Sequence, residues 1–198
     1  MKKRPNLNEL AKEIHNDNKL KGFHDVDWSN EHCLMLAICE LCEAIEADRK
    51  GKKEISKEDI DKMEYITTFH PNNTKLFIYA YQNRIKGSTE EELADFVICL
   101  LDLAGKKKQE VTLYDNNVAN SFKYYMSEKK GFAERIYFIT NEVMHYYKYE
   151  YPYTIGMINN SISCVEYLCN DMNIDLWLHV SLKLKYNKTR PYKHGKEY

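Results

Sequence analysis

Two pairs of acidic residues have the types and spacing of a metal site. Glu40 and Glu43 lie three residues apart in a segment with a helical pattern, so their side chains project from neighbouring turns of one face. Glu92 and Asp95 repeat this spacing near the start of a second predicted helix. If the two helices pack side by side, four carboxylates meet, and they repel one another unless a divalent cation compensates their charge. Magnesium suits such a set because it prefers oxygen ligands and keeps positions open for phosphate oxygens.

Acidic pairs at this spacing are also common on solvated helix faces, and acids near a helix N-terminus are favoured by the helix dipole. The first pair argues for a site, because Glu40 and Glu43 interrupt an apolar stretch from Cys33 to Ile45. An unpaired charge buried there would cost several kcal/mol. The residues alone leave both interpretations open.

A third acid lies on the same stripe as the second pair. Asp102 follows Asp95 by seven residues, which places it about 10 Å further along the helix axis. This distance is too long for both carboxylates to bind one ion through short bonds. We expect Asp102 to orient a basic residue from elsewhere in the chain.

Basic and polar residues gather near the C-terminus. Lys183 and Asn187 share one face of the last predicted helix, and Arg190, His194 and Lys196 follow. These side chains are expected to bind phosphate oxygens. A solvated basic helix end, which complements the helix dipole, is the alternative.

Two aromatic residues precede the helix of the first acidic pair. Phe23 and Trp28 are candidates for a wall against a nucleobase. Trp28 comes directly before the capping residue Ser29, so it can equally pack on the following helix as a hydrophobic staple. We favour the staple for Trp28.

Few residues interrupt the predicted helices. The 198 residues include seven Gly and four Pro, which leaves long stretches free of helix breakers. We predict an all-α, four-helix-bundle-like single domain over 1–198, with residues 52–87 as an inserted helical hairpin and 106–127 as a less regular connection. The helices are expected at about 6–19, 29–49, 88–105, 131–148, 154–171 and 174–188, with two further short helices inside the hairpin. Gly105 is expected to end the helix that carries Glu92 and Asp95.

Composition excludes several classes of protein. Lys plus Arg number 29 against 30 Asp plus Glu, so no overall positive charge favours a nucleic-acid partner. The longest apolar runs are far shorter than the ~20 residues of a membrane-spanning helix, and the N-terminus lacks a secretory pattern. We expect a soluble, cytoplasmic protein whose six cysteines are reduced thiols packed within helices, including the Cys39 and Cys42 pair.

The phrases Glu40-Leu41-Cys42-Glu43 and Glu92-Leu93-Ala94-Asp95 resemble the paired ExxE and ExxD motifs of MazG-like, all-α nucleoside triphosphate pyrophosphohydrolases. The loop 21–25 and the C-terminal run 183–196 are similar to further segments of that family. The similar segments are about 20–50, 88–105 and 174–197, and roughly half of the chain, 52–87 and 106–172, carries little of the family's pattern. The chain departs from the family pattern at His24, where Trp is common, and at Cys99, where a basic residue is frequent.

The resemblance implies a MazG-type core and hydrolysis of a nucleoside triphosphate between its α and β phosphates, which gives a monophosphate and pyrophosphate. It also implies Mg²⁺, or Mn²⁺ in its place, held by Glu40, Glu43, Glu92 and Asp95, with Glu40 or Glu43 helping to activate the attacking water. A homodimer or larger homo-oligomer is expected from the same resemblance. The two departures leave the preferred nucleotide open.

Two other functions compete with this hypothesis. Glu142 and His145 have the Glu-x-x-His spacing of di-iron carboxylate proteins, but that site needs two such motifs and the chain has one. A non-catalytic, nucleotide-binding helical scaffold or sensor would keep the same acids and basic residues without turnover.

Overall fold

The computed structural model describes residues 2–51, 55–111, 116–128, 130–144, 154–195 and 197. All regular structure in these ranges is helical, which confirms the predicted all-α fold. The helices are α1 (Leu7–Leu20), α2 (Asn30–Arg49), α3 (Lys57–Phe69), α4 (Thr74–Arg84), α5 (Thr89–Lys107), α6 (Asn116–Ser127), α7 (Phe132–Met144), α8 (Thr154–Asp171) and α9 (Leu176–Thr189), followed by a short 3₁₀ turn, Tyr192–Gly195.

Side-chain caps start the helices where the sequence predicts them. The side chains of Asn6, Ser29, Ser56 and Ser88 each accept a hydrogen bond from a backbone N–H in the first turn of the helix that follows. These contacts satisfy donors that have no partner within a helix. The predicted starts of α1, α2 and α5 are therefore confirmed.

Two predictions about local structure were wrong. The region 106–127, expected to be irregular, contains α6. Gly105 does not end its helix, because α5 continues to Lys107 and ends at Lys108, whose φ of 53° gives a left-handed cap. Gly105 instead allows a close approach of α1 to α5, since a Cβ there would lie 2.4 Å from the backbone oxygen of Ala11.

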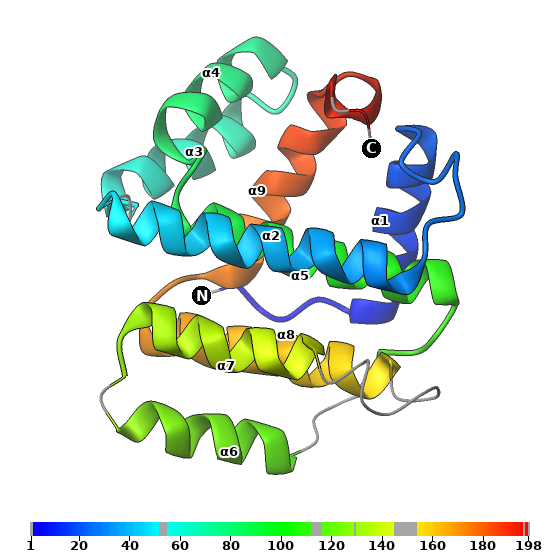
Figure 1. The fold of residues 1–198 in the computed structure, drawn as a ribbon. Coiled ribbons are helices and arrows are strands. Elements are labelled where there is room, and N and C mark those ends of the chain that lie inside the picture. Colours follow the sequence, from blue (N-terminus) through cyan, green and yellow to red (C-terminus); the bar gives the residue numbers. More distant parts are fainter. Residues whose placement is uncertain are drawn as a thin grey trace.

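Helix α5 lies at the centre of the fold and packs against α1, α2, α8 and α9 (Figure 1). It is apolar around most of its circumference, with Leu93, Phe96, Leu100 and Leu101 fully buried. A helix that is buried on all sides is typical of the middle of a multi-helix core. Every other element of the candidate site is positioned against it.

Helix α2 packs along α5 with one face only. Its buried side includes Ala37, Leu41 and Ala44, whereas Cys39 and Cys42 on the other side are exposed. The prediction that these two cysteines pack in the core was wrong, because they share the polar face with the acidic pair. All six cysteines are free thiols, as predicted.

The two helices predicted within 52–87 are confirmed as α3 and α4, which pack on each other. They form a second apolar cluster with α9, to which Met63, Phe77, Tyr81, Leu182 and Tyr186 contribute. On the opposite side of α2 and α5, α6, α7 and α8 form a further layer (Figure 1). Among the described residues, no helix combines the length and the apolar character needed to cross a membrane.

The approach of α1 to α5 predicts a strong effect of one added methyl group. Gly105→Ala should destabilise the protein by about 1–3 kcal/mol, because the new Cβ would clash with the Ala11 backbone and the His15 Cβ. Gly156→Ala is the matched control: this glycine is also helical, has no atom within 4 Å of an added Cβ, and should be neutral or stabilising by up to about 1 kcal/mol. Urea unfolding of the two variants measures both values, and equal effects would contradict the close approach.

Candidate metal centre and cavity

A cavity of about 650 Å³ opens between α2, α5, the loop before α2 and the C-terminal segment. Most of the residues singled out in the sequence line it. Its walls are formed by Asn18, Phe23, His24, Trp28, His32, Cys33, Leu36, Cys39, Glu40, Glu43, Asp95, Ile98, Cys99, Asp102, Leu103, Asn187, Arg190, His194 and Glu197.

The two long walls run in opposite directions. Lys106, near the end of α5, donates a hydrogen bond to the backbone oxygen of Trp28, just before α2 begins. Glu92, at the start of α5, lies beside Glu40 and Glu43, further along α2. The antiparallel packing therefore puts the carboxylates at one end of the cavity and Trp28 at the other.

Three of the four predicted metal ligands come together. One carboxylate oxygen each of Glu40, Glu43 and Glu92 lies within 4.8 Å of the others. Glu43 is exposed, Glu40 is half-buried and Glu92 is buried, so the cluster reaches from the surface into the interior. Burial raises the pKa of Glu92 to about 8, and the nearby charges of Glu91, Asp95 and Glu40 contribute to the rise.

Asp95, the fourth predicted ligand, lines the cavity but has a cationic partner. Its Oδ2 lies 2.5 Å from the Nζ of Lys183, which lies equally close to Oε1 of Glu91. The side chain of Lys183 is 7% exposed. Burial alone would lower the pKa of Lys183, but the two carboxylates raise it, so the ammonium stays charged.

Lys183 thus pairs with two carboxylates of the chain, whereas it was expected from the sequence to bind phosphate oxygens. Its side chain does not line the cavity, and its positive charge compensates the carboxylates of Glu91 and Asp95 near the start of α5. Breaking such a pair leaves an uncompensated charge in the interior, which is far more costly than losing a surface pair.

Glu91 also belongs to the acidic group at the start of α5, although this was not predicted from the sequence. Its backbone N–H donates to the Ser88 hydroxyl, which is one half of a capping box. Its carboxylate, however, accepts hydrogen bonds from the Gly87 backbone, the Tyr81 hydroxyl and Lys183. Glu91 is therefore an anchor that joins α4, α5 and α9.

The C-terminal residues take different positions. Asn187, Arg190 and His194 line the cavity, as a phosphate clamp requires, whereas Lys196 lies outside the described residues. The Oδ1 of Asn187 is buried and has no hydrogen-bond partner within the described part of the chain. A buried polar atom without a partner on a cavity wall is well placed to bind a ligand.

The aromatic residues at the other end of the cavity are stacked. The rings of Trp28 and His32 are nearly parallel, with centroids 4.2 Å apart, and both line the cavity. Phe23 meets His194 edge to face at 4.9 Å. Trp28 contacts His32 through this stack and faces the cavity, so it fits the predicted base wall at least as well as the staple that the sequence favoured.

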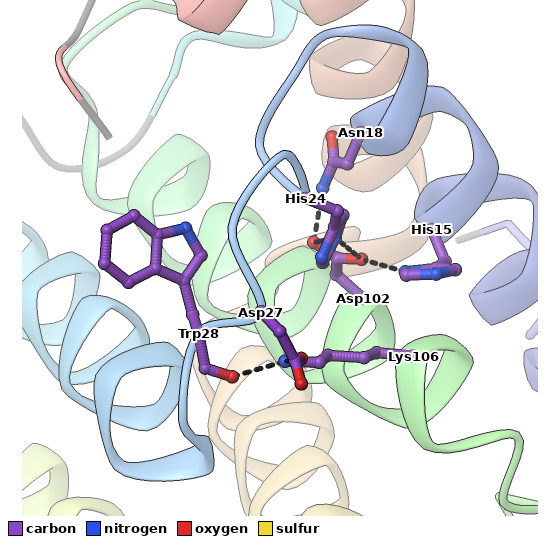
Figure 2. A network of polar contacts seen from close by, with 7 residues as sticks. All are labelled: His15, Asn18, His24, Asp27, Trp28, Asp102 and Lys106. Atoms are coloured by element: carbon purple, nitrogen blue, oxygen red, sulfur yellow. Dashed lines mark hydrogen bonds and ion pairs between the residues drawn. The ribbon is translucent and has the colours of Figure 1, made fainter.

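Asp102 is the centre of a polar network, which Figure 2 shows. His24 Nε2 lies 2.9 Å and His15 Nδ1 lies 3.0 Å from its Oδ1, and the Asn18 amide donates to its Oδ2 at 2.7 Å. Burial raises the pKa of Asp102, but the hydrogen bonds from His15 and His24 outweigh this and leave the pKa below its ordinary value. Asp102 thus contacts two imidazoles and one amide, and its predicted role in orienting a basic residue stays a prediction.

His15, Asn18, Glu91 and Tyr81 have roles that the sequence did not reveal. Asn18 and His15 lie three residues apart on α1 and share a face, which is the one signal that could have linked them. Glu91 stands next to Glu92, so its orientation toward Lys183 depends on packing that sequence spacing does not encode.

Comparison with models of protein families, with curated proteins and with solved structures gives no match for this chain. The resemblance to MazG-like pyrophosphohydrolases therefore stays a prediction based on the quoted motifs. The interpretation of the site depends on its own geometry.

The buried ion pair predicts a large loss of stability when its cation is removed. Lys183→Met keeps the side-chain volume but leaves Glu91 and Asp95 without a counter-charge, which should cost about 3–5 kcal/mol. Lys188→Met is the control on the same helix, α9. Lys188 pairs with Glu13 and Asp17 of α1, but its side chain is half-exposed, so this substitution should cost about 1 kcal/mol or less. Chemical denaturation measures both, and a small loss for Lys183→Met would contradict its role as counter-ion.

The raised pKa of Glu92 predicts that the metal-free protein is less stable at higher pH. The unfolded chain releases this proton near the ordinary value of 4.5, whereas the folded protein holds it up to about 8. The folded state binds more protons between these values, so stability falls as pH rises from about 5 to 8 and this loss then ends. Urea unfolding in EDTA should show a steeper decline for the natural protein than for Glu92→Gln; parallel curves would show that Glu92 titrates normally.

Proposed function

We propose that this chain is a magnesium-dependent nucleoside triphosphate pyrophosphohydrolase, which cleaves between the α and β phosphates to give a nucleoside monophosphate and pyrophosphate. The observation that carries the proposal is the meeting of Glu40, Glu43 and Glu92 within 4.8 Å, with Glu40 and Glu43 on the wall of a cavity of about 650 Å³. Arg190 and Asn187 line the same cavity. A site for anionic phosphates needs these features together: acids for the metal and a cation for the phosphates.

The donor set fits magnesium. The three converging groups are carboxylates, and burial, followed by the nearby charges of Glu91 and Asp95, raises the pKa of Glu92 to about 8. A bound Mg²⁺ would offset phosphate charge and make a water molecule more acidic. Glu40, Glu43 and Glu92 would hold the ion, with Asp95 as the fourth predicted ligand.

The chain's own residues then account for the hydrolysis. Glu40 or Glu43 accepts a proton from the attacking water, whose oxygen forms the new bond to phosphorus while the bridging P–O bond breaks and pyrophosphate leaves. Arg190 neutralises the developing charge on the phosphate oxygens, since it is a permanently charged donor on the cavity wall. Phe23 and Trp28 supply apolar and aromatic surface for the nucleobase at the opposite end.

The residues that line the cavity all come from one chain. The expected homodimer or larger assembly stays a prediction. The di-iron alternative gains no support: Glu142 lies on α7 and does not line the cavity, and His145 is outside the described residues. The following experiment distinguishes the enzyme from a sensor that binds nucleotides without hydrolysing them.

Purified protein with Mg²⁺ should release pyrophosphate from at least one common ribo- or deoxyribonucleoside triphosphate. Glu40→Gln and Glu43→Gln should each lower kcat about 100-fold or more, because both metal charge compensation and proton acceptance are weakened. Coupled detection of pyrophosphate across a panel of triphosphates measures the rates.

Glu46→Gln is the matched control on the same helix. Glu46 pairs with Arg49 and Lys50 on the exposed side of α2 and does not line the cavity, so this variant should keep full activity. Tight binding of a triphosphate without pyrophosphate release would show that the chain is a nucleotide sensor and not a pyrophosphohydrolase. Full activity in both Glu40→Gln and Glu43→Gln would show that the site lies elsewhere.

A further inference from the structure

Three segments of the chain converge on the Asp102 carboxylate at the aromatic end of the cavity. His15 comes from α1, His24 from the loop after α1, and Asp102 from α5 (Figure 2). One nitrogen of each imidazole and one carboxylate oxygen lie within 4.8 Å of one another. This group is separate from the acids at the start of α5, because Asp102 lies about 10 Å along the helix from Asp95.

The contact distances are close to those of ligands on a common ion. Metal–nitrogen and metal–oxygen bonds of roughly 2.0–2.2 Å at octahedral to tetrahedral angles place two ligand atoms roughly 2.9–3.5 Å apart. The observed separations from Asp102 Oδ1 are 3.0 Å to His15 Nδ1 and 2.9 Å to His24 Nε2. Small side-chain shifts would therefore admit an ion.

The group is also reachable. The side chains of His15, His24 and Asp102 are 22%, 12% and 15% exposed, so they are sheltered without being sealed. His24, Asp102 and the neighbouring Asn18 line the cavity. An ion here would have its remaining positions open to water, to the Asn18 amide oxygen, or to a donor atom of a molecule in the cavity.

We infer that His15, His24 and Asp102 form a second metal site, selective for a borderline transition ion such as Zn²⁺ or Co²⁺ and distinct from the magnesium site. Two imidazoles and one carboxylate are the donors that such ions prefer, whereas magnesium takes oxygen ligands. Each imidazole would bind through the nitrogen that now contacts Asp102. The proton on that nitrogen moves to the other ring nitrogen or is released to water, so binding should weaken as the pH falls below the range in which imidazole is neutral.

This inference does not depend on the proposed function, because it uses different residues and a different class of ion. A purely structural network is the alternative, since the same hydrogen bonds tie α1 and the loop to α5. Glutamine at either histidine position separates the two. Its amide can still donate to Asp102, but it is a poor ligand for a transition ion.

The experiment is a titration of the full-length protein with Co²⁺ in excess Mg²⁺, followed by visible absorption. One Co²⁺ per chain should bind and give a ligand-field spectrum. His15→Gln and His24→Gln should each weaken its affinity by about 100-fold or more, given that losing a residue that only supports a ligand already costs about 10–100-fold. His32→Gln, which changes a histidine in the same cavity, and Glu40→Gln should retain the natural affinity.

Two results would overturn the inference. One is the absence of saturable binding, or affinity that is unchanged in both His15→Gln and His24→Gln. The other is a thiolate charge-transfer band in the near ultraviolet, which would place the ion on Cys33 or Cys99 of the same cavity. If a glutamine variant unfolds, paramagnetic broadening of imidazole signals in the natural protein decides: His15 and His24 should broaden selectively among the seven histidines, and any other pattern contradicts the site.

Discussion

The electrostatics of the α2–α5 contact govern the rest of this structure. Five carboxylates, those of Glu40, Glu43, Glu91, Glu92 and Asp95, gather where the two helices meet, and a single buried ammonium, that of Lys183, compensates two of them. The ammonium draws α9 against α5, and the Tyr81 hydroxyl on Glu91 draws in α4. The other three acids, Glu40, Glu43 and Glu92, each place a carboxylate oxygen within 4.8 Å of the others, and burial, together with the charges of Glu91, Asp95 and Glu40, raises the pKa of Glu92 to about 8. Under the proposed function, a bound cation would compensate the charge of these acids.

The opposite end of the cavity is built from segments that are held to one another. Lys193 donates its backbone N–H to the Lys21 oxygen at 2.8 Å, and Tyr192 bonds to Asp25, so the C-terminal turn and the loop before α2 form one cover. Lys106 fixes that loop to α5 through Asp27 at 2.7 Å. Arg190 lines the same cavity as Glu40 and Glu43, and the Trp28–His32 stack lies at the end opposite those acids. A charged end and an aromatic end in one cavity match the two chemical halves of a nucleotide.

Local rules explain which features the sequence predicts well. The spacing of Glu40 and Glu43 depends only on helix geometry, and Ser29 or Ser88 caps a helix through its own hydroxyl, so these features are readable from the chain. Lys183 was not readable in the same way, because its partner Glu91 lies 92 residues away and competes with phosphate for the same charge. The role of Gly105 also depends on a distant segment, the backbone of α1, which no pattern around residue 105 reveals. The network of Asp102 lies between these cases: its distance from Asp95 follows from helix geometry, but the two histidines come from packing.

The most direct test of this account is the position of a divalent ion in crystals of the protein. Mn²⁺ scatters anomalously and can take the place of Mg²⁺ among oxygen ligands, so its peak reports the magnesium site without dependence on turnover. The account predicts a peak within bonding distance of Glu40, Glu43 and Glu92, with Lys183 still paired to Glu91. A Mn²⁺-soaked crystal with no peak at these three carboxylates, or with ordered Mn²⁺ bound only elsewhere on the chain, would contradict it.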